Sequence, residues 1–348
     1  IEHAYYFLVP LSLFAFLLLE FGAGSLLSFV VKSPLILEET SIFLNYRAYG
    51  IFFAFANMGF RAFYVGIART KVITYTTIVL ATVNIFLDYC LIFGHLGFPE
   101  MGIAGAALAS VIAEASAFVF FVVYTISVIP LKKYHLFYFR GFSWRLLGRT
   151  IRLASPMMVQ HFISLATWLT FFLFVEQMGE RPLAISIIIR SFYIVLMIPI
   201  WGFSSATNTL VSNVIGQNKQ VEVMPIIYKT ALLCVSGVFI LVVAGLFMPT
   251  YVLSVYTNNA ELIQSAIPVL YMISGSALFL GAGFIFFSGV SGTGKTQISL
   301  IIEIITILIY LMATYMFVQV WHVSITAVWS TEFIYAIVLG FLSWLYLR

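Results

Sequence analysis

Residues 226–247 read IIYKTALLCVSGVFILVVAGLF, with one charged side chain, Lys229, near the start of the run. A helix rises about 1.5 Å per residue, so a run of this length crosses the roughly 30 Å hydrocarbon core of a bilayer. Hydrocarbon offers no hydrogen-bond partner, so the backbone must satisfy its N–H and C=O groups within the segment. This run therefore predicts a transmembrane α-helix.

Similar runs fill the rest of the chain. Hydrophobic residues make up 62% of the 348 residues, charged residues make up 9%, and the mean hydropathy is +1.08. Too few polar residues remain to cover a water-soluble surface. The sequence predicts an all-α, polytopic membrane protein with about ten transmembrane helices, near residues 5–31, 42–64, 72–93, 102–128, 150–175, 183–215, 226–247, 262–290, 297–318 and 323–346.

The basic residues predict how these helices are oriented. Outside the spans, nearly all Lys and Arg lie in the even-numbered loops and at the carboxyl end, and the long loop 131–149 is the most basic. Basic loops remain on the cytoplasmic side of the membrane, so we expect these loops to be cytoplasmic. The net charge of +4 follows membrane topology and does not indicate nucleic-acid binding.

A short internal repeat suggests two pseudo-symmetric lobes. The sequences GIARTK at 66–71 and GTGKTQ at 292–297 both lie at a predicted cytoplasmic turn between two spans, and internal repeats are common in transporters. A six-plus-six arrangement would place two further helices before Ile1, so the amino terminus is expected to be missing. The predicted parts are an amino-terminal lobe with four of six helices at 1–130, a basic linker at 131–149 and a six-helix carboxyl-terminal lobe at 150–348.

Residues 289–296, GVSGTGKT, match the phosphate-binding P-loop pattern letter for letter. That motif works where a strand feeds the loop and a soluble α/β core holds the nucleotide. Here runs of bilayer length lie on both sides, and the repeat copy has Ala68 and Arg69 where a P-loop needs Gly and Lys. We interpret the string as a glycine-rich turn between two helices, and we expect no nucleotide-driven enzyme.

Carboxylates within apolar runs indicate function, because a charge in hydrocarbon is costly unless it serves a pathway. Glu303, near the predicted cytoplasmic end of its helix, is expected to face water, and Glu332, near mid-depth, remains an open candidate. The other three are Glu20, Asp88 and Glu114.

Asp88 is the strongest of these candidates. Asn84 and Asp88 are four residues apart and share a helix face, and Ser110 and Glu114 repeat this spacing on the next helix. With Asn57 on the preceding helix, these side chains could line a wet cavity. Burial favours the neutral form of a carboxyl, so Asp88 could take up and release a proton near neutral pH. The alternative is a structural hydrogen bond or ion pair with Arg47 or Arg61.

Other polar residues interrupt the carboxyl-terminal lobe. Gln160 and His161 lie in the first turns of their predicted span, and Arg190 lies in the next. His161 can be a packing or hydrogen-bonding residue instead of a titrating one. Arg190 is either the counter-ion of a carboxylate or a contact for a substrate anion. In the amino-terminal lobe, the small residues of GIAGAALA at 102–109 would let two helix backbones approach closely.

Several stretches resemble the multidrug and toxic compound extrusion (MATE) transporters, within a larger group that includes polysaccharide and lipid flippases. They follow the family order over nearly the whole chain: NIFLDYCLIFG at 84–94, GFP at 97–99, MGIAGAA at 101–107, Ala-Ser-Pro at 154–156, PIWG at 199–202 with Ala206, and LVSNVIG at 210–216. The chain is identified as a MATE-like protein that lacks its first two helices.

The resemblance implies export of cationic or amphipathic compounds in exchange for H⁺ or Na⁺, by rocking of two six-helix lobes. Asn84 and Asp88 match an Asn and an Asp that some members use in the fifth helix, and Ser110 fills a position where relatives often carry a small hydroxyl residue. Other members bind a cation through acids in the seventh and tenth helices. Here those segments show Gln160, His161 and Ser164, and then no acid between Leu262 and Gly289. This difference from the family pattern favours coupling to protons through the amino-terminal lobe.

We therefore expect a monomeric antiporter of the bacterial inner membrane that exports small organic cations. It would need no metal or cofactor beyond the coupling ion. A lipid-linked oligosaccharide or polysaccharide flippase remains the alternative, since arginines facing one cavity would suit a pyrophosphate group. Arg47, Arg61 and Arg190 are the residues that would serve it.

Overall fold

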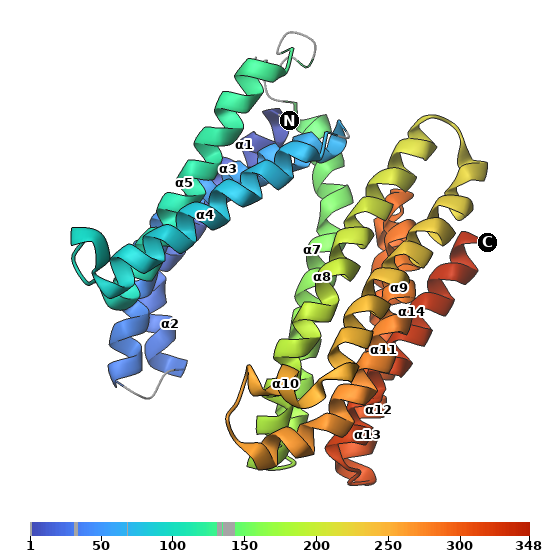
Figure 1. Ribbon diagram of the computed structural model, residues 1–348. Coiled ribbons are helices and arrows are strands. Elements are labelled where there is room, and N and C mark those ends of the chain that lie inside the picture. The colour runs from blue at the N-terminus through green and yellow to red at the C-terminus, as the bar shows by residue number, and fades with distance from the viewer. Residues whose placement is uncertain (1, 31–33, 68, 131–133, 135–142) are drawn as a thin grey trace. The chain divides into compact units, whose positions relative to one another are not determined.

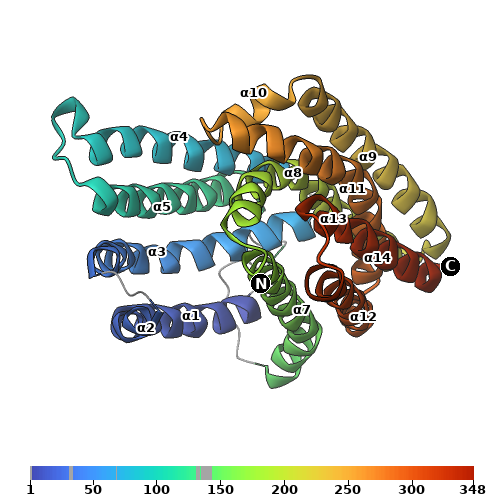
Figure 2. The same ribbon diagram turned by 90° about the horizontal axis from the view of Figure 1, so that it is seen from below.

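The structure, a computed structural model, describes residues 2–30, 34–67, 69–130, 134 and 143–348. Within these ranges all regular secondary structure is helical (Figure 1, Figure 2). The all-α prediction is thus confirmed there. Most of the predicted basic linker falls outside the described residues.

The helices form two units, Ile1–Thr150 and Ile151–Arg348, called here the amino unit and the carboxyl unit. In the amino unit, α1, α3, α5 and α4 lie side by side in that order, each packed against the next (Figure 2). The α5 helix therefore lies between α3 and α4. The elements of this unit are α1 (Glu2–Leu17), the π-helical turn η1 (Leu18–Gly22), α2 (Ala23–Val30), α3 (Pro34–Gly66), α4 (Lys71–Phe93), the 3-10 turn η2 (His95–Gly97) and α5 (Gly102–Val128).

The carboxyl unit is built around α11, which packs against α8, α9 and α14. Its core holds the large buried side chains Phe171, Leu196, Ile273, Leu280 and Trp329. The elements are α7 (Trp144–Glu176, which belongs to this unit from Ile151 on), α8 (Glu180–Gly216), the 3-10 turn η3 (Gln220–Glu222), α9 (Val223–Phe247), α10 (Pro249–Ser254), α11 (Ala260–Gly292), α12 (Thr296–Tyr315), the π-helical turn η4 (Met316–Val320), α13 (Ile325–Trp329) and α14 (Thr331–Leu347).

Each of the predicted spans falls on a helix or on consecutive helical pieces. Across the described residues, nine helical segments are long and apolar enough to cross a membrane. The remaining predicted span, residues 42–64, lies on α3. This helix is long enough to cross a membrane but also carries Glu38, Glu39, Arg47 and Arg61. The prediction of about ten membrane helices is consistent with this arrangement.

Some helices begin before the apolar run that predicted them. Helix α3 starts at Pro34, where a proline suits the first helical turn, and α7 starts at Trp144 before Arg145 and Arg149. Hydropathy marks the part of a helix that suits hydrocarbon, whereas capping residues set where the helix ends.

The P-loop-like string lies on helix and not on a strand-to-helix loop. Residues 289–292 are the last residues of α11, and α12 begins at Thr296. Ser212 on α8 donates a hydrogen bond of 2.8 Å to the carbonyl oxygen of Gly292. The string therefore makes a tight turn between two helices, and this turn packs on α8. This agrees with its interpretation from the sequence as a glycine-rich turn.

Close contact between α4 and α5 depends on Gly105. A methyl group placed there would lie 2.6 Å from the carbonyl oxygen of Leu91 on α4. That oxygen also accepts a 2.8 Å hydrogen bond from the backbone N–H of Met101, so it cannot easily move aside. The small-residue sequence at 102–109 does bring two helix backbones together, as predicted.

Replacing Gly105 should test this contact. We expect Gly105→Ala to destabilise the protein by about 1–3 kcal/mol, because the new methyl group must push α4 and α5 apart. Thermal unfolding of the purified protein in detergent would measure the change. Gly202→Ala on α8 is the matched control, since nothing lies within 4 Å of its added methyl group; equal unfolding temperatures for the two variants would contradict the prediction.

Candidate functional site

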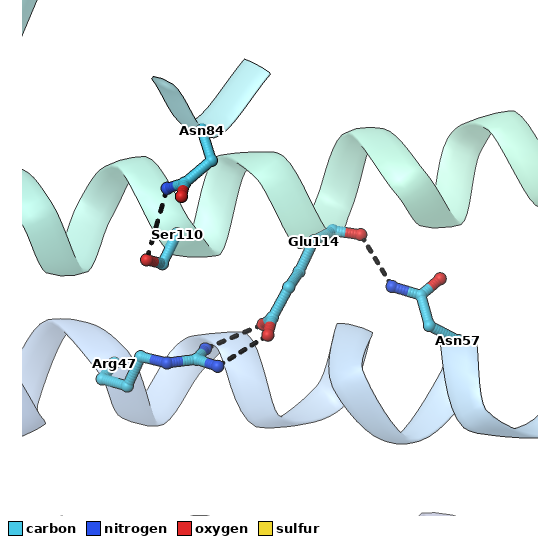
Figure 3. Close-up of polar contacts among 5 residues, drawn as sticks. All are labelled: Arg47, Asn57, Asn84, Ser110 and Glu114. Atoms are coloured by element: carbon cyan, nitrogen blue, oxygen red, sulfur yellow. Dashed lines mark hydrogen bonds and ion pairs between the residues drawn. The ribbon is translucent and has the colours of Figure 1, made fainter. Parts of the chain in front are cut away.

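A group of polar side chains lies where α5 packs between α3 and α4 (Figure 3). The α5 helix contributes Ser110 and Glu114, α4 contributes Asn84, and α3 contributes Arg47 and Asn57. The structure therefore brings together most of the predicted amino-lobe residues from three helices.

Asn84 and Ser110 join α4 to α5. The amide nitrogen of Asn84 donates a long hydrogen bond of 3.5 Å to the hydroxyl oxygen of Ser110. Both side chains are half-buried. At this distance the contact is weak, so these two groups remain able to exchange partners.

Glu114 is held by a two-pronged ion pair with Arg47. The two terminal guanidinium nitrogens donate to the two carboxylate oxygens at 2.8 and 2.6 Å, and the side chains are 30% and 16% exposed. This fork-to-fork geometry is the strong form of the interaction. Because its charge is matched, Glu114 acts as a structural link between α3 and α5.

Asn57 is buried, with 8% of its surface exposed. Its amide nitrogen donates a 3.0 Å hydrogen bond to the backbone carbonyl of Glu114. Its side-chain oxygen is also buried and has no hydrogen-bond partner among the described residues. Asn57 thus fixes the same segment of α5 that the ion pair holds, and it keeps one unused acceptor.

Asp88 lies one helical turn beyond Asn84 on α4 and is half-buried. Among the residues that the structure describes, it forms no hydrogen bond and no ion pair. The alternative reading, an ion pair with Arg47 or Arg61, is not what the structure shows. Arg47 holds Glu114, and Arg61 donates to the hydroxyl of Thr77 at 3.2 Å.

Glu20 has different surroundings from this group of polar side chains. It is exposed in the π-helical turn η1. Over the described part of the chain it has no hydrogen bond or ion pair to Asn57, Asn84 or Ser110. Its assignment to an ion-coupling site stays a prediction.

The polar residues predicted for the carboxyl unit form no hydrogen bond or ion pair with one another in the described structure. Gln160 is buried on α7, where its backbone carbonyl accepts a 2.9 Å hydrogen bond from Ser164. His161 is exposed on the same helix. Arg190 on α8 is also exposed, and its guanidinium lies 5.5 Å from the ring centre of Phe172. Arg190 is therefore engaged with an aromatic face, and no carboxylate pairs with it among the described residues.

The expectation that Glu303 faces water was wrong. Glu303 is 2% exposed and Glu332 is 3% exposed. The sequence did contain a signal for this: Glu303 shares a face of α12 with Tyr310, seven residues on, and Glu332 shares a face of α14 with Tyr335, three residues on. A tyrosine on the same face as a carboxylate points to the same neighbouring helix, and here each donates to the carboxylate of that neighbour.

No group of three or more His, Cys, Asp or Glu side chains in the described ranges could hold a metal ion. The chemistry available to the amino-unit group is therefore that of one free carboxylate beside amide and hydroxyl groups. Such a set can bind a proton or attract a cation.

Comparison with known proteins supplies the family context. A profile of the MatE family matches residues 1–90 and 156–316. A probable multidrug resistance protein NorM from Agrobacterium fabrum is 30% identical over 214 residues, which is 61% of this chain and 44% of that protein. The NorM protein of Rhizobium meliloti is 28% identical over 294 residues, 81% of this chain and 62% of that protein. The chain thus spans about half the length of these relatives.

Solved structures with a similar fold include a MATE protein in its straight conformation, with a TM-score of 0.86 and 17% identity over 100% of this chain and 78% of that chain. A mutant of the Vibrio cholerae MATE transporter VcmN gives 0.83 and 14% identity over 99% of this chain and 76% of that one. A MOP superfamily transporter from Pyrococcus furiosus gives 0.82 and 19% identity over 100% and 78%. At these identities the likeness shows the fold alone.

The ion pair between Arg47 and Glu114 gives a stability prediction. We expect Arg47→Met to destabilise the protein by about 1–3 kcal/mol, because it leaves a half-buried carboxylate without its partner. Thermal unfolding in detergent would measure the loss. Arg61→Met on the same helix is the control, since Arg61 is exposed and makes one hydrogen bond to Thr77.

A double variant, Arg47→Met with Glu114→Gln, should recover part of that loss, because no unmatched charge remains. If Arg47→Met unfolds at the same temperature as Arg61→Met, the pair does not link α3 to α5.

Proposed function

Because this chain belongs to the MatE family, we propose that the whole protein is a secondary active transporter, not an enzyme, which exports cationic or amphipathic small molecules in exchange for H⁺. The chain is an integral, multi-pass protein of the bacterial inner membrane. The names of its relatives, probable multidrug resistance proteins, support the choice of substrate class.

The observation that carries this proposal is the contrast between two carboxylates of the amino unit. Glu114 is neutralised by Arg47 through two hydrogen bonds. Asp88, half-buried on α4, has no cationic partner within the described ranges. An ionisable group in a membrane helix is costly unless it serves transport, so Asp88 is the group that we assign to ion coupling.

The exchange follows from competition for one negative charge. An ionised Asp88 attracts a cationic substrate, and a proton on the carboxyl removes that attraction. The proton and the substrate then cannot both hold the site, which is the requirement for exchange. A ligand shifts a conformational equilibrium only as far as it prefers one state, so protonation of Asp88 must favour the state that has released its substrate.

Asn84 and Ser110 would transmit the change in charge at Asp88 from α4 to the neighbouring helix α5. Asn84 lies one turn before Asp88 on α4, and its weak bond to Ser110 on α5 spans 3.5 Å. A weak bond costs little to break. We propose that this contact is made or broken as Asp88 gains or loses its proton.

H⁺ is proposed ahead of Na⁺ as the coupling ion. A sodium site needs several oxygen ligands, and among the described residues Asp88 belongs to no group of three or more His, Cys, Asp or Glu side chains that could hold a metal ion. Helix α11, where some relatives carry a cation-binding acid, has Glu261 in its first turn, where that side chain is exposed and pairs with Arg181.

The flippase alternative would need arginines that meet at one place. Arg47 and Arg61 are fourteen residues apart on α3, roughly 21 Å along the helix axis. Arg47 is already paired with Glu114, and Arg190 stacks on Phe172. These engagements favour a site with one free negative charge, which suits an organic cation better than a pyrophosphate.

Asp88→Asn should abolish proton-driven export of ethidium by the full-length protein, because an amide keeps the shape of the carboxyl but cannot bind the proton. The measurement is ethidium efflux from proteoliposomes under an imposed pH gradient. Glu100→Gln is the control, as it makes the same chemical change at an exposed position of the same unit.

Undiminished efflux by Asp88→Asn would remove Asp88 from the mechanism. Efflux that follows an imposed Na⁺ gradient and ignores the pH gradient would overturn the choice of coupling ion. Export of a lipid-linked sugar without ethidium export would favour the flippase.

A further inference from the structure

Two glutamates are buried in the carboxyl unit among α7, α8, α12 and α14. Glu303 on α12 is 2% exposed, and Glu332 on α14 is 3% exposed. Over the described part of the chain, neither forms an ion pair with Lys or Arg. A buried carboxylate without a cation is costly, and such a group is stabilised by hydrogen bonds or by binding a proton.

Tyrosines satisfy these carboxylates in a crossed pattern. Tyr335 on α14 donates a 2.9 Å hydrogen bond to Glu303 on α12, and Tyr310 on α12 donates a 2.9 Å hydrogen bond to Glu332 on α14. Each of the two helices therefore supplies one carboxylate and one phenol to the other. Tyr193 on α8 adds a 3.3 Å hydrogen bond to Glu332.

The two glutamates differ in how their oxygens are used. In Glu332 each oxygen has its own donor, Tyr310 for Oε1 and Tyr193 for Oε2. In Glu303 the hydroxyls of Ser164, at 2.7 Å, and Tyr335, at 2.9 Å, both lie against Oε1. The Ser164 hydroxyl also lies 2.9 Å from the backbone carbonyl of Gln160, and its one hydrogen can bond to only one of these two acceptors at a time. Oε2 of Glu303 is buried and has no hydrogen-bond partner in the described structure.

The charges facing Glu303 come from a small set of groups. From α7, His161 lies close enough for an electrostatic interaction with Glu303, and from α14, Tyr335 interacts with it. Tyr335 is in turn coupled to Tyr193 on α8 and to Glu332. The titratable side chains of α11 are Glu261 and Tyr271, and both are exposed.

We infer that Glu303 is a second proton-binding site, in the carboxyl unit, and that the proton is carried on its Oε2 atom. When the proton binds, the O–H bond forms on the oxygen that has no partner, Oε1 keeps its hydrogen bond from Tyr335, and the Ser164 hydroxyl can turn to the carbonyl of Gln160. When the proton leaves, the carboxylate is held by Ser164 and Tyr335. The group can thus change charge with no more than a rotation of one hydroxyl.

His161 is the ionisable group of α7 that lies near Glu303. It is exposed on α7, three residues and so about one helical turn before Ser164, and Ser164 touches Glu303. We assign the imidazole as the acceptor of the proton that leaves Glu303, and uptake reverses this transfer.

The role of this site in transport depends on the exchange proposed above. It would let each unit bind a proton of its own, Asp88 in one and Glu303 in the other. The existence of the site does not depend on that exchange, so it is tested by its protonation and not by efflux.

The test is pH-difference infrared spectroscopy of the full-length protein in nanodiscs, which reads the carbonyl band of a protonated carboxyl group. The wild type should show a carboxylic-acid band that changes with pH, and Glu303→Gln should lose one component of that band. The same component should persist in Glu332→Gln, the matched change on the facing helix, and in Asp88→Asn. Size-exclusion profiles and unfolding temperatures would establish that each variant is folded.

A second pair of variants tests the assignment without altering either carboxyl. Tyr335→Phe removes a donor from Glu303 and should change the pH range over which the band titrates. Tyr310→Phe removes the equivalent donor from Glu332 and should leave that range unchanged. A titrating band that is the same in Glu303→Gln as in the wild type, a Glu303 that stays charged at every pH, or a Glu303 component removed by Na⁺ at constant pH would each overturn the inference.

Discussion

Hydrocarbon cannot hydrogen-bond, and this property of the solvent governs the whole molecule. It forces the backbone of every span into a helix, and it makes each polar side chain within a span depend on a partner from another helix. Packing between helices is therefore set by a few specific polar contacts as well as by apolar surface. The two units meet this requirement in different ways.

The amino unit neutralises charge with charge. Arg47 and Glu114 join α3 to α5 through a fork of two short hydrogen bonds, and Asn57 supports the same turn of α5. The carboxyl unit uses neutral donors, since Tyr193, Tyr310 and Tyr335 surround its two buried glutamates. A guanidinium keeps its charge at any physiological pH, so Arg47 always presents a cation to Glu114. A phenol adds no charge, so a carboxyl beside it is free to be neutral or ionised.

Much of the fold could be predicted from the sequence, because span length and hydropathy are local properties. The turn at 292–297 and the close contact at Gly105 were also readable, since glycine has few other uses within a membrane helix. The partners of the charged residues could not be predicted from the sequence. Arg47 and Glu114 are 67 residues apart, and no local pattern shows that α3 faces α5. Glu303 was misplaced for a related reason: depth along a helix says nothing about which face is covered.

The crossed bonds between α12 and α14 have a mechanical consequence. Glu303 precedes Tyr310 along α12, while Glu332 precedes Tyr335 along α14, and each bond joins the early residue of one helix to the later residue of the other. Axial sliding of one helix along the other would displace both donor–acceptor pairs together. The two bonds therefore oppose shear between α12 and α14 at two levels of the helix pair.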